Sequence, residues 1–262
     1  NNTYSLSFRR VFNEKLVGNF LTAYSEFFTN FNLGGADGLN SENKILDQTL
    51  STNLTFFQSS DLEWRTGAQI KQLDFKYLNT FLEDTSFYIG ENPIEAGFYT
   101  KLKWKGFSRF IIEPGVRYNY YSVYSSTPYI DLRLGAKYLL TDDRYINIAL
   151  GNYHQFIQTV QDDYNPTILD SWLAVDNSID PAEAQQAVIG YEEYIRDIYK
   201  IQIEAYYKTI QNMLTFEDFR SSTDAEVSDE KISDTFTPAD GYAYGLELFF
   251  QKNIGNLTGW IA

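Results

Sequence analysis

The chain has 262 residues, of which 17% are aromatic, and its 35 acidic and 21 basic residues leave a net charge of −14. The absence of cysteine and the single histidine argue against a zinc site or an iron–sulfur cluster. The negative charge argues against nucleic-acid binding, which needs a basic face. No apolar run reaches the ~18 residues of a transmembrane helix.

Period-two alternation of apolar and polar residues dominates the chain. Between positions 62 and 71, for example, Leu62, Trp64 and Ile70 share one face, while Glu63 and Lys71 share the other. We predict no helix and twelve strands. In chain order they cover residues 3–12, 16–31, 46–58, 62–77, 94–104, 108–121, 129–140, 145–158, 184–195, 199–209, 241–251 and 257–262.

The length of these segments points to a membrane. Strands of soluble proteins average ~5–6 residues, whereas a tilted strand that crosses a bilayer needs ~9–11. One face of each segment is apolar, with aromatic residues towards its ends, which suits lipid. The other face mixes charged residues, glutamine and glycine, which suits a wet or plugged lumen.

The connections alternate in length without exception. Short turns fall at 13–15, 59–61, 105–107, 141–144, 196–198 and 252–256, and longer loops fall at 32–45, 78–93, 122–128, 159–183 and 210–240. This alternation predicts an all-β, antiparallel, up-and-down transmembrane barrel with every short turn at one rim and every long loop at the other. Bacterial outer-membrane barrels have this asymmetry.

Four of the long loops, 32–45, 78–93, 159–183 and 210–240, carry the excess negative charge. A solvated hydrophilic rim explains this charge. Steering of cationic ligands or binding of Ca²⁺ is the alternative, although none of the loops has the ligand spacing of a calcium site.

Short motifs resemble those of a known family. The segment Asn177-Ser-Ile-Asp-Pro-Ala-Glu183 precedes a strand that carries Gly190-Tyr-Glu192, and Gly241-Tyr-Ala-Tyr-Gly-Leu-Glu247 begins another strand. Glu113-Pro-Gly-Val-Arg117 and the segment 128–133 are similar to strands from the middle of the same barrels. In order and spacing these motifs resemble TonB-dependent outer-membrane receptors, in the style of the large receptors of Bacteroidetes-like bacteria.

The resemblance implies a barrel of ~22 strands closed around a plug domain. Residues 1–262 would then be part of the barrel domain and supply about twelve strands, while the plug and the other strands lie outside this chain. Because the chain starts within an alternating pattern and stops within an apolar run, we expect it to be a piece of a longer protein.

The resemblance also implies a function, which is TonB-dependent uptake of a scarce ligand across the outer membrane. Such ligands are siderophores, cobalamin, oligosaccharides or peptides. The implied partners are the TonB complex acting through the plug, the ligand, outer-membrane lipid and a surface lipoprotein. The alternatives are a passive porin or channel and a structural or secretion-linked barrel. We expect neither enzymatic activity nor a cofactor.

Two sets of residues are candidates for binding. Aromatic residues of the long loops offer stacking faces to a ligand, and these are Tyr164, Trp172, Phe216 and Phe219. Charged residues of the lumen face are expected to contact the plug, and these are Arg117, Arg133, Glu204 and Glu247.

No catalytic or metal-binding set is evident. His154 shares the parity of Ile146 and Ile148, so we expect it to point outwards at the base of a loop. Adjacent acids such as Glu192 and Glu193 face opposite sides of a strand and cannot share a site.

Overall fold

The computed structural model of the chain describes residues 1–34, 38–81, 84–124, 128–160, 171–216 and 236–262. Within these ranges, no helix has the length and apolar character that would let it cross a membrane. The described residues form fifteen strands. They are β1 (Asn2–Asn13), β2 (Leu16–Leu33), β3 (Leu39–Phe57), β4 (Leu62–Phe81), β5 (Asp84–Glu91), β6 (Ile94–Phe107), β7 (Phe110–Tyr121), β8 (Tyr129–Thr141), β9 (Arg144–Gln155), β10 (Ile157–Val160), β11 (Ser171–Ala174), β12 (Ala182–Ile195), β13 (Tyr199–Phe216), β14 (Phe236–Lys252) and β15 (Gly259–Ile261).

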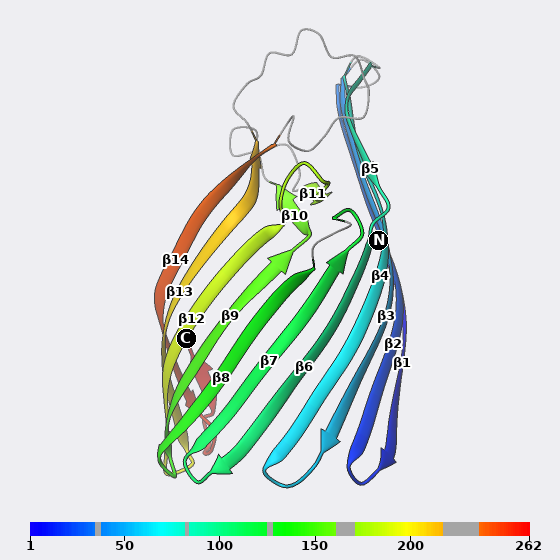
Figure 1. Cartoon of the computed structure of the whole chain (residues 1–262). Coiled ribbons are helices and arrows are strands. Elements are labelled where there is room, and N and C mark those ends of the chain that lie inside the picture. Colours follow the sequence, from blue (N-terminus) through cyan, green and yellow to red (C-terminus); the bar gives the residue numbers. More distant parts are fainter. Residues whose placement is uncertain (35–37, 82–83, 125–127, 161–170, 217–235) are drawn as a thin grey trace.

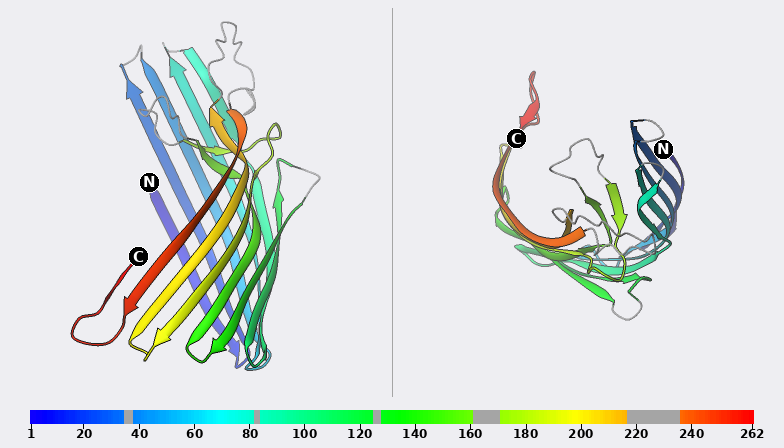
Figure 2. Two further views of the ribbon diagram at one scale, coloured as in Figure 1. Left: turned by 90° about the vertical axis from the view of Figure 1, so that its left-hand side faces the viewer. Right: turned by 90° about the horizontal axis from the view of Figure 1, so that it is seen from above.

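Thirteen of these strands form one antiparallel sheet in the order β1-β2-β3-β4-β6-β7-β8-β9-β12-β13-β14-β15, with β5 paired to the far end of β4. The strands run diagonally, and the short turns lie together at one end of the sheet (Figure 1). Seen from above, the sheet curves into an open arc with β1 and β15 at its two ends (Figure 2). The predicted all-β, antiparallel meander is therefore confirmed, as an open section of a barrel wall.

Several strands extend further towards the long loops than predicted. β2 and β3 stay paired up to Leu33 and Leu39, so the predicted loop 32–45 is mostly strand. β4 continues to Phe81, and β13 continues to Phe216 past a bulge at Asn212, whose φ is 56°. The predicted strands were too short at this end. Residues in the extensions still alternate, but their polar side chains point outwards and their apolar ones inwards, which is the reverse of the pattern used to predict the strands.

This reversal is visible along β4. Up to Lys71, the outward residues are apolar, such as Trp64 and Ile70, and both are about half exposed. Beyond it, the outward residue Asp74 is exposed, whereas Leu73, Phe75 and Tyr77 on the inward face are buried. An apolar outer surface suits lipid and a polar outer surface suits water, so the upper part of the strand stands clear of the bilayer.

Three strands were not predicted, namely β5, β10 and β11. The predicted strand 145–158 stops at Gln155, because Phe156 turns into a buried cluster. β10 and β11 then form a separate two-stranded hairpin inside the arc, visible in both views of Figure 2. The expectation that residues 159–183 form only a loop was wrong, since four-residue strands show too little alternation to be recognised.

Candidate functional site

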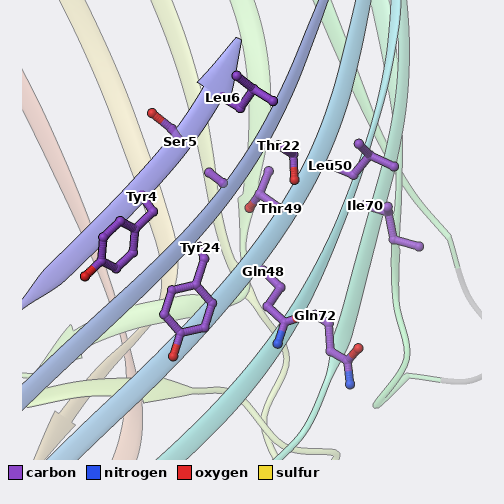
Figure 3. Close-up of a pocket in the computed structure, with 11 residues that line it drawn as sticks. Tyr4, Ser5, Leu6, Thr22, Tyr24, Gln48, Thr49, Leu50, Ile70 and Gln72 are labelled. Carbon is purple, nitrogen blue, oxygen red and sulfur yellow. The ribbon is translucent and has the colours of Figure 1, made fainter.

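The outward face has a sharp boundary between apolar and polar side chains. A shallow groove of about 700 Å³ runs across β1 to β4 on this face. Figure 3 shows the side chains that line it. Tyr4, Tyr24, Gln48 and Gln72 pair across the four strands in one row. The next row towards the short turns holds Leu6, Thr22, Leu50 and Ile70, and the next row towards the long loops holds Asn2, Glu26, Leu46 and Asp74. The row of two tyrosines and two glutamines therefore marks the edge of the apolar band on the long-loop side.

The inward side of the arc contains a compact apolar cluster at the long-loop end. It is built from the wall and from the β9–β12 connection together: Phe75, Tyr77, Ile89, Tyr121, Phe156, Leu173, Ala174, Val175, Ile179, Leu214 and Phe236. The rings of Tyr121 and Phe156 stack with their centroids 4.6 Å apart and 7° between their planes. The expectation of a lumen face that is polar throughout was wrong, because at this end the wall packs against a folded loop.

Side-chain hydrogen bonds fix this inner hairpin (β10 and β11) to both sides of the arc. On one side, Asn43 of β3 donates through Nδ2 to the carbonyl of Trp172, at 2.9 Å. On the other side, Gln158 of β10 accepts from the backbone N–H of Leu214 at 3.0 Å and donates to the carbonyl of Asn212 at 3.2 Å. The hairpin thus lies across the lumen end and braces strands that are far apart in the sheet.

The connection that follows the hairpin is held to β7 and its loop. The Tyr121 hydroxyl donates to the carbonyl of Val175 at 3.2 Å, and the Tyr124 hydroxyl donates to the carbonyl of Ile179. Burial raises the pKa of Tyr124 well above its usual range, with further contributions from Tyr129 and from the acids Asp180 and Asp176. Tyr124 therefore remains a neutral hydrogen-bond donor at any pH the cell meets.

Of the four aromatic ligand candidates, one can be placed with its side chain. Trp172 lies on the inner hairpin opposite Thr159, and 38% of it is exposed. Phe216 ends β13 opposite Phe236, but its side chain is outside the described residues, as are Tyr164 and Phe219 altogether. Their proposed role in ligand binding stays a prediction.

The lumen wall below the hairpin holds the predicted basic pair. A hollow of about 400 Å³ is lined by Lys101, Glu113, Arg117, Arg133 and Tyr153, with Gly115 and Gly135 among its other lining residues. These charged residues sum to two positive charges in a chain that is strongly negative. Arg117 donates from Nε to Asn119 at 2.6 Å, and the guanidinium of Arg133 lies 4.6 Å from the centre of the Tyr153 ring. The nearest carboxylate to Arg133 is Asp131, at 3.9 Å.

The predicted acidic pair lies elsewhere on the same face. Glu204 and Glu247 sit directly opposite each other on β13 and β14, and the described residues provide neither with an ion pair. Like charges in this arrangement repel each other. The structure therefore places Arg117 with Arg133 and Glu204 with Glu247, as two separate patches of opposite sign.

Other lumen charges neutralise each other across the strands. Glu113 on β7 accepts both Lys101 and Lys103 of β6, at 3.6 and 3.0 Å, and Glu192 on β12 lies between Lys137 and Lys200, at 3.5 and 3.9 Å. These ion pairs link β6 to its neighbour β7 and β12 to its neighbour β13, and they also link β12 to β8 across β9. By contrast, Arg133 has only the 3.9 Å contact with Asp131, and Glu204 and Glu247 have no ion pair among the described residues.

On the lumen face, large side chains cover several glycines of neighbouring strands. A Cβ on Gly67 would lie 2.5 Å from the Tyr99 ring, and a Cβ on Gly245 would lie 2.8 Å from the Tyr206 ring. Each tyrosine therefore lies over a glycine of the neighbouring strand. Arg117 lies in the same way over Gly97, where a Cβ would come 2.5 Å from its guanidinium.

The prediction that His154 points outwards was wrong. Its Nδ1 lies 2.7 Å from Asp131, a carboxylate only 2% exposed, and its ring packs against Tyr129. The β8–β9 ladder ends at Arg133 and Gly151, and the Asn152 side chain bonds to the backbone of Ile130 and Leu132 in its place. This break in the ladder ends the alternation that was used to place His154.

Sequence reasoning also missed a polar niche beside the inner connection. A hollow of about 580 Å³ is lined by Glu91, Asn92, Ser122, Asp176 and Asn177 among others. Burial raises the pKa of Glu91, and the nearby Asp176 carboxylate raises it further. The apolar run at 172–175 within a long loop was the available sequence signal that this loop folds inwards.

An antiparallel arc with an apolar outer band, a polar lumen and an inward-folded loop defines the wall of a transmembrane β-barrel. Comparisons with protein-family models and with curated proteins find no match for the sequence. Solved structures do match. The ferric yersiniabactin uptake receptor of Yersinia pestis has a TM-score of 0.68 at 13% identity, over 97% of this chain and 40% of that one.

The ferripyoverdine receptor of Pseudomonas aeruginosa gives a TM-score of 0.66 at 13% identity, and the RagAB peptide transporter gives 0.58 at 9%. Both matches cover 97% of this chain, but only 38% and 34% of the respective receptors. The chain therefore has the fold of a barrel section of TonB-dependent outer-membrane receptors and spans less than half the length of these three. The resemblance found in the sequence motifs is confirmed at the level of the fold.

Proposed function

We propose that the chain is part of the barrel of an outer-membrane transporter that takes up a scarce ligand in a TonB-dependent manner. The observation that carries the proposal is the arc itself, with its lipid-facing band and its inward-folded loop over a charged lumen. The solved structures of similar fold include receptors described as taking up ferric siderophores, and others described as a copper transporter and a peptide transporter. The ligand is a siderophore, cobalamin, an oligosaccharide or a peptide.

The two lumen patches support a separate plug domain. Among the described residues, Arg117 has no ion pair and Arg133 has only the 3.9 Å contact with Asp131, while Glu204 and Glu247 face each other without a cation. A plug that presents acids to the first patch and bases to the second would neutralise both. It would also connect the barrel to the TonB complex, and a surface lipoprotein would act at the long-loop rim.

Ligand binding belongs to the long-loop end. There the exposed ring of Trp172 stands on a hairpin that is fixed to both sides of the lumen. Tyr164, Phe216 and Phe219 complete the proposed stacking surface. This surface needs neither a metal nor a cofactor of its own, and no chemical step is proposed for it.

The test is uptake by cells that produce the full-length protein. Labelled ferric siderophores, cobalamin, oligosaccharides and peptides are offered in turn, with and without a protonophore that collapses the proton gradient. We expect accumulation of one of them to stop when the gradient is lost, while binding at the cell surface persists. Unchanged accumulation would identify a passive channel instead.

A further inference from the structure

The outward surface of β1 carries a charge, that of Arg10, which the proposed function does not use. Arg10 of β1 pairs with Gly18 of β2, two positions from Phe8 and Phe12. Phe8 stacks on Phe20, and Tyr4 lies against Tyr24 of the boundary row, so these even-numbered residues share the outward face. Arg10 therefore points towards lipid, whereas its neighbour Arg9 points into the lumen.

The depth of Arg10 follows from strand geometry. It lies six residues from Tyr4 of the boundary row, which at ~3.3 Å per residue is ~20 Å along the strand. For a strand tilted by ~40°, this corresponds to a depth of ~15 Å along the membrane normal, counted from the boundary row, in an apolar band ~25 Å tall. The Cα of Arg10 is therefore inside the apolar band but nearer its short-turn edge, within reach of the headgroups for a long side chain.

The local packing directs the side chain towards that edge. Gly18 leaves a gap on the outward face, and a Cβ there would lie 2.8 Å from the ring of Phe12. Phe12 thus occupies the gap, and the guanidinium of Arg10 lies 5.3 Å from the centre of its ring. Such cation–π contact stabilises a guanidinium that has lost part of its water.

Arg10 has no ion pair among the described residues. Arg144, at the short-turn end of β9, differs from Arg10 in this respect, because its guanidinium lies 2.9 Å from the carboxylate of Glu193. A lone cation on the lipid face is costly unless an anion accompanies it. Phosphate oxygens match the planar fork of a guanidinium and lie at the depth towards which Arg10 points.

We propose that Arg10, seated on Phe12 above Gly18, binds the phosphate of a glycerophospholipid in the leaflet at the short-turn rim. The inference rests on the proposed placement of the barrel in the outer membrane. The lipid contributes its phosphate to the guanidinium and its acyl chains to the apolar surface formed by Phe8, Phe20 and Leu54. Both parts of the lipid are needed for retention.

The test uses the full-length protein in detergent, with retained lipid measured by native mass spectrometry during titration with phosphatidylglycerol. We expect Arg10→Gln to weaken retention about tenfold, the usual effect of losing one charge-assisted hydrogen-bonded contact. Arg9→Gln removes the same charge from the lumen face and should retain lipid like the wild type. Arg10→Lys should restore part of the loss, and diacylglycerol, which lacks phosphate, should not be retained by any variant.

Three results would overturn the inference. They are equal retention by Arg10→Gln and the wild type, equal loss in Arg9→Gln, and displacement of the lipid by millimolar inorganic phosphate. Failure of the underlying function looks different, because a protein outside the membrane would need no detergent and retain no lipid in any form. Arg10→Gln is expected to fold at least as well as the wild type, since it removes a charge from the apolar band.

Discussion

Neighbouring residues on β8 face lipid and lumen in turn. The loss of stability caused by a charged substitution distinguishes the two faces. Leu134 is on the outward face in mid-strand, and Arg133 next to it lies in the lumen hollow. A charged residue near the bilayer midplane costs ~2–4 kcal/mol. We therefore expect Leu134→Arg to destabilise the folded full-length protein in lipid vesicles by about that amount, measured by urea unfolding.

The matched control is Arg133→Leu, which changes the same types of residue in the opposite direction. It should cost much less, because Arg133 has only a 3.9 Å contact with Asp131 and a ring contact with Tyr153. Equal tolerance of the two substitutions would mean that the faces of β8 are assigned the wrong way round.

Glu91, at the end of β5 and beyond the apolar band, gives stability a pH dependence. Its pKa is raised above the ordinary 4.5 by burial and then by Asp176. The folded protein therefore holds this proton more tightly than the unfolded chain. Stability from this group is present at pH values below 4.5 and is lost as the pH rises through the folded-state pKa.

Glu91→Gln should accordingly raise the thermal stability of the full-length protein at pH 7. The gain should shrink as the pH falls below 4.5, because the wild-type carboxyl then becomes protonated in the unfolded chain as well as in the folded protein. Thermal unfolding of both proteins at pH 4 and pH 7 measures this. A gain of the same size at both pH values would show that the ionisation of Glu91 is not its cause.

At the scale of elements, the inner hairpin depends on a few aromatic contacts. Phe156 is 4% exposed and stacks on Tyr121, and truncation of a buried phenylalanine costs ~3–5 kcal/mol. Because the strands have their own ladder, we expect Phe156→Ala to release the hairpin and leave the barrel folded. Limited proteolysis should then cut within residues 156–182, while the heat-resistant mobility of the barrel on gels is kept.

Thr159→Ala changes an exposed residue of the same hairpin and should leave it resistant to protease. If the two variants are cut at the same rate, the hairpin does not owe its position to the aromatic stack. Loss of the folded barrel in Phe156→Ala would show that the hairpin and the wall unfold as a single unit.

The wall could be predicted from the sequence because its signal is local. Alternation over Leu62 to Lys71 fixes which side chains face outwards without knowledge of any other strand, and the pairing in the structure agrees. The inner hairpin could not be predicted in this way. Its partners Asn43 and Leu214 lie far away in sequence, as does Tyr121, the partner of the connection that follows, and its strands have four residues each. His154 was misplaced for a related reason, since the side chain of Asn152 interrupts the ladder just before it.

At the scale of the whole molecule, substitution of the facing carboxylates Glu204 and Glu247 tests whether a plug domain lies against them. Without a partner, replacing both with glutamine would relieve repulsion and stabilise the barrel. If a plug supplies a cation between them, the double substitution should instead weaken the binding of the plug inside the barrel. We expect Glu204→Gln with Glu247→Gln to leak ions in planar bilayers, where the wild-type full-length protein stays closed.

Asp142→Asn at a short turn removes a charge far from this patch and should leave the protein closed. A wild-type protein that conducts at rest would contradict the plug itself. A double variant that does not conduct would instead show that the plug stays bound without these two carboxylates. The predicted contact of Arg117 and Arg133 with the plug can be examined by the same recordings.

The tyrosines that lie over inward glycines have a mechanical consequence. If β6 slid along β4 by two residues, Tyr99 would leave Gly67 and collide with Arg65 or Gln69. A slide of β13 along β14 would likewise bring Tyr206 from Gly245 onto the Cβ of Ala243 or the side chain of Glu247. Each ring thus acts as a stop against shear between strands. This section of the wall is consequently stiff along the direction of its strands, because sliding between these pairs of strands is blocked by side chains that are already packed.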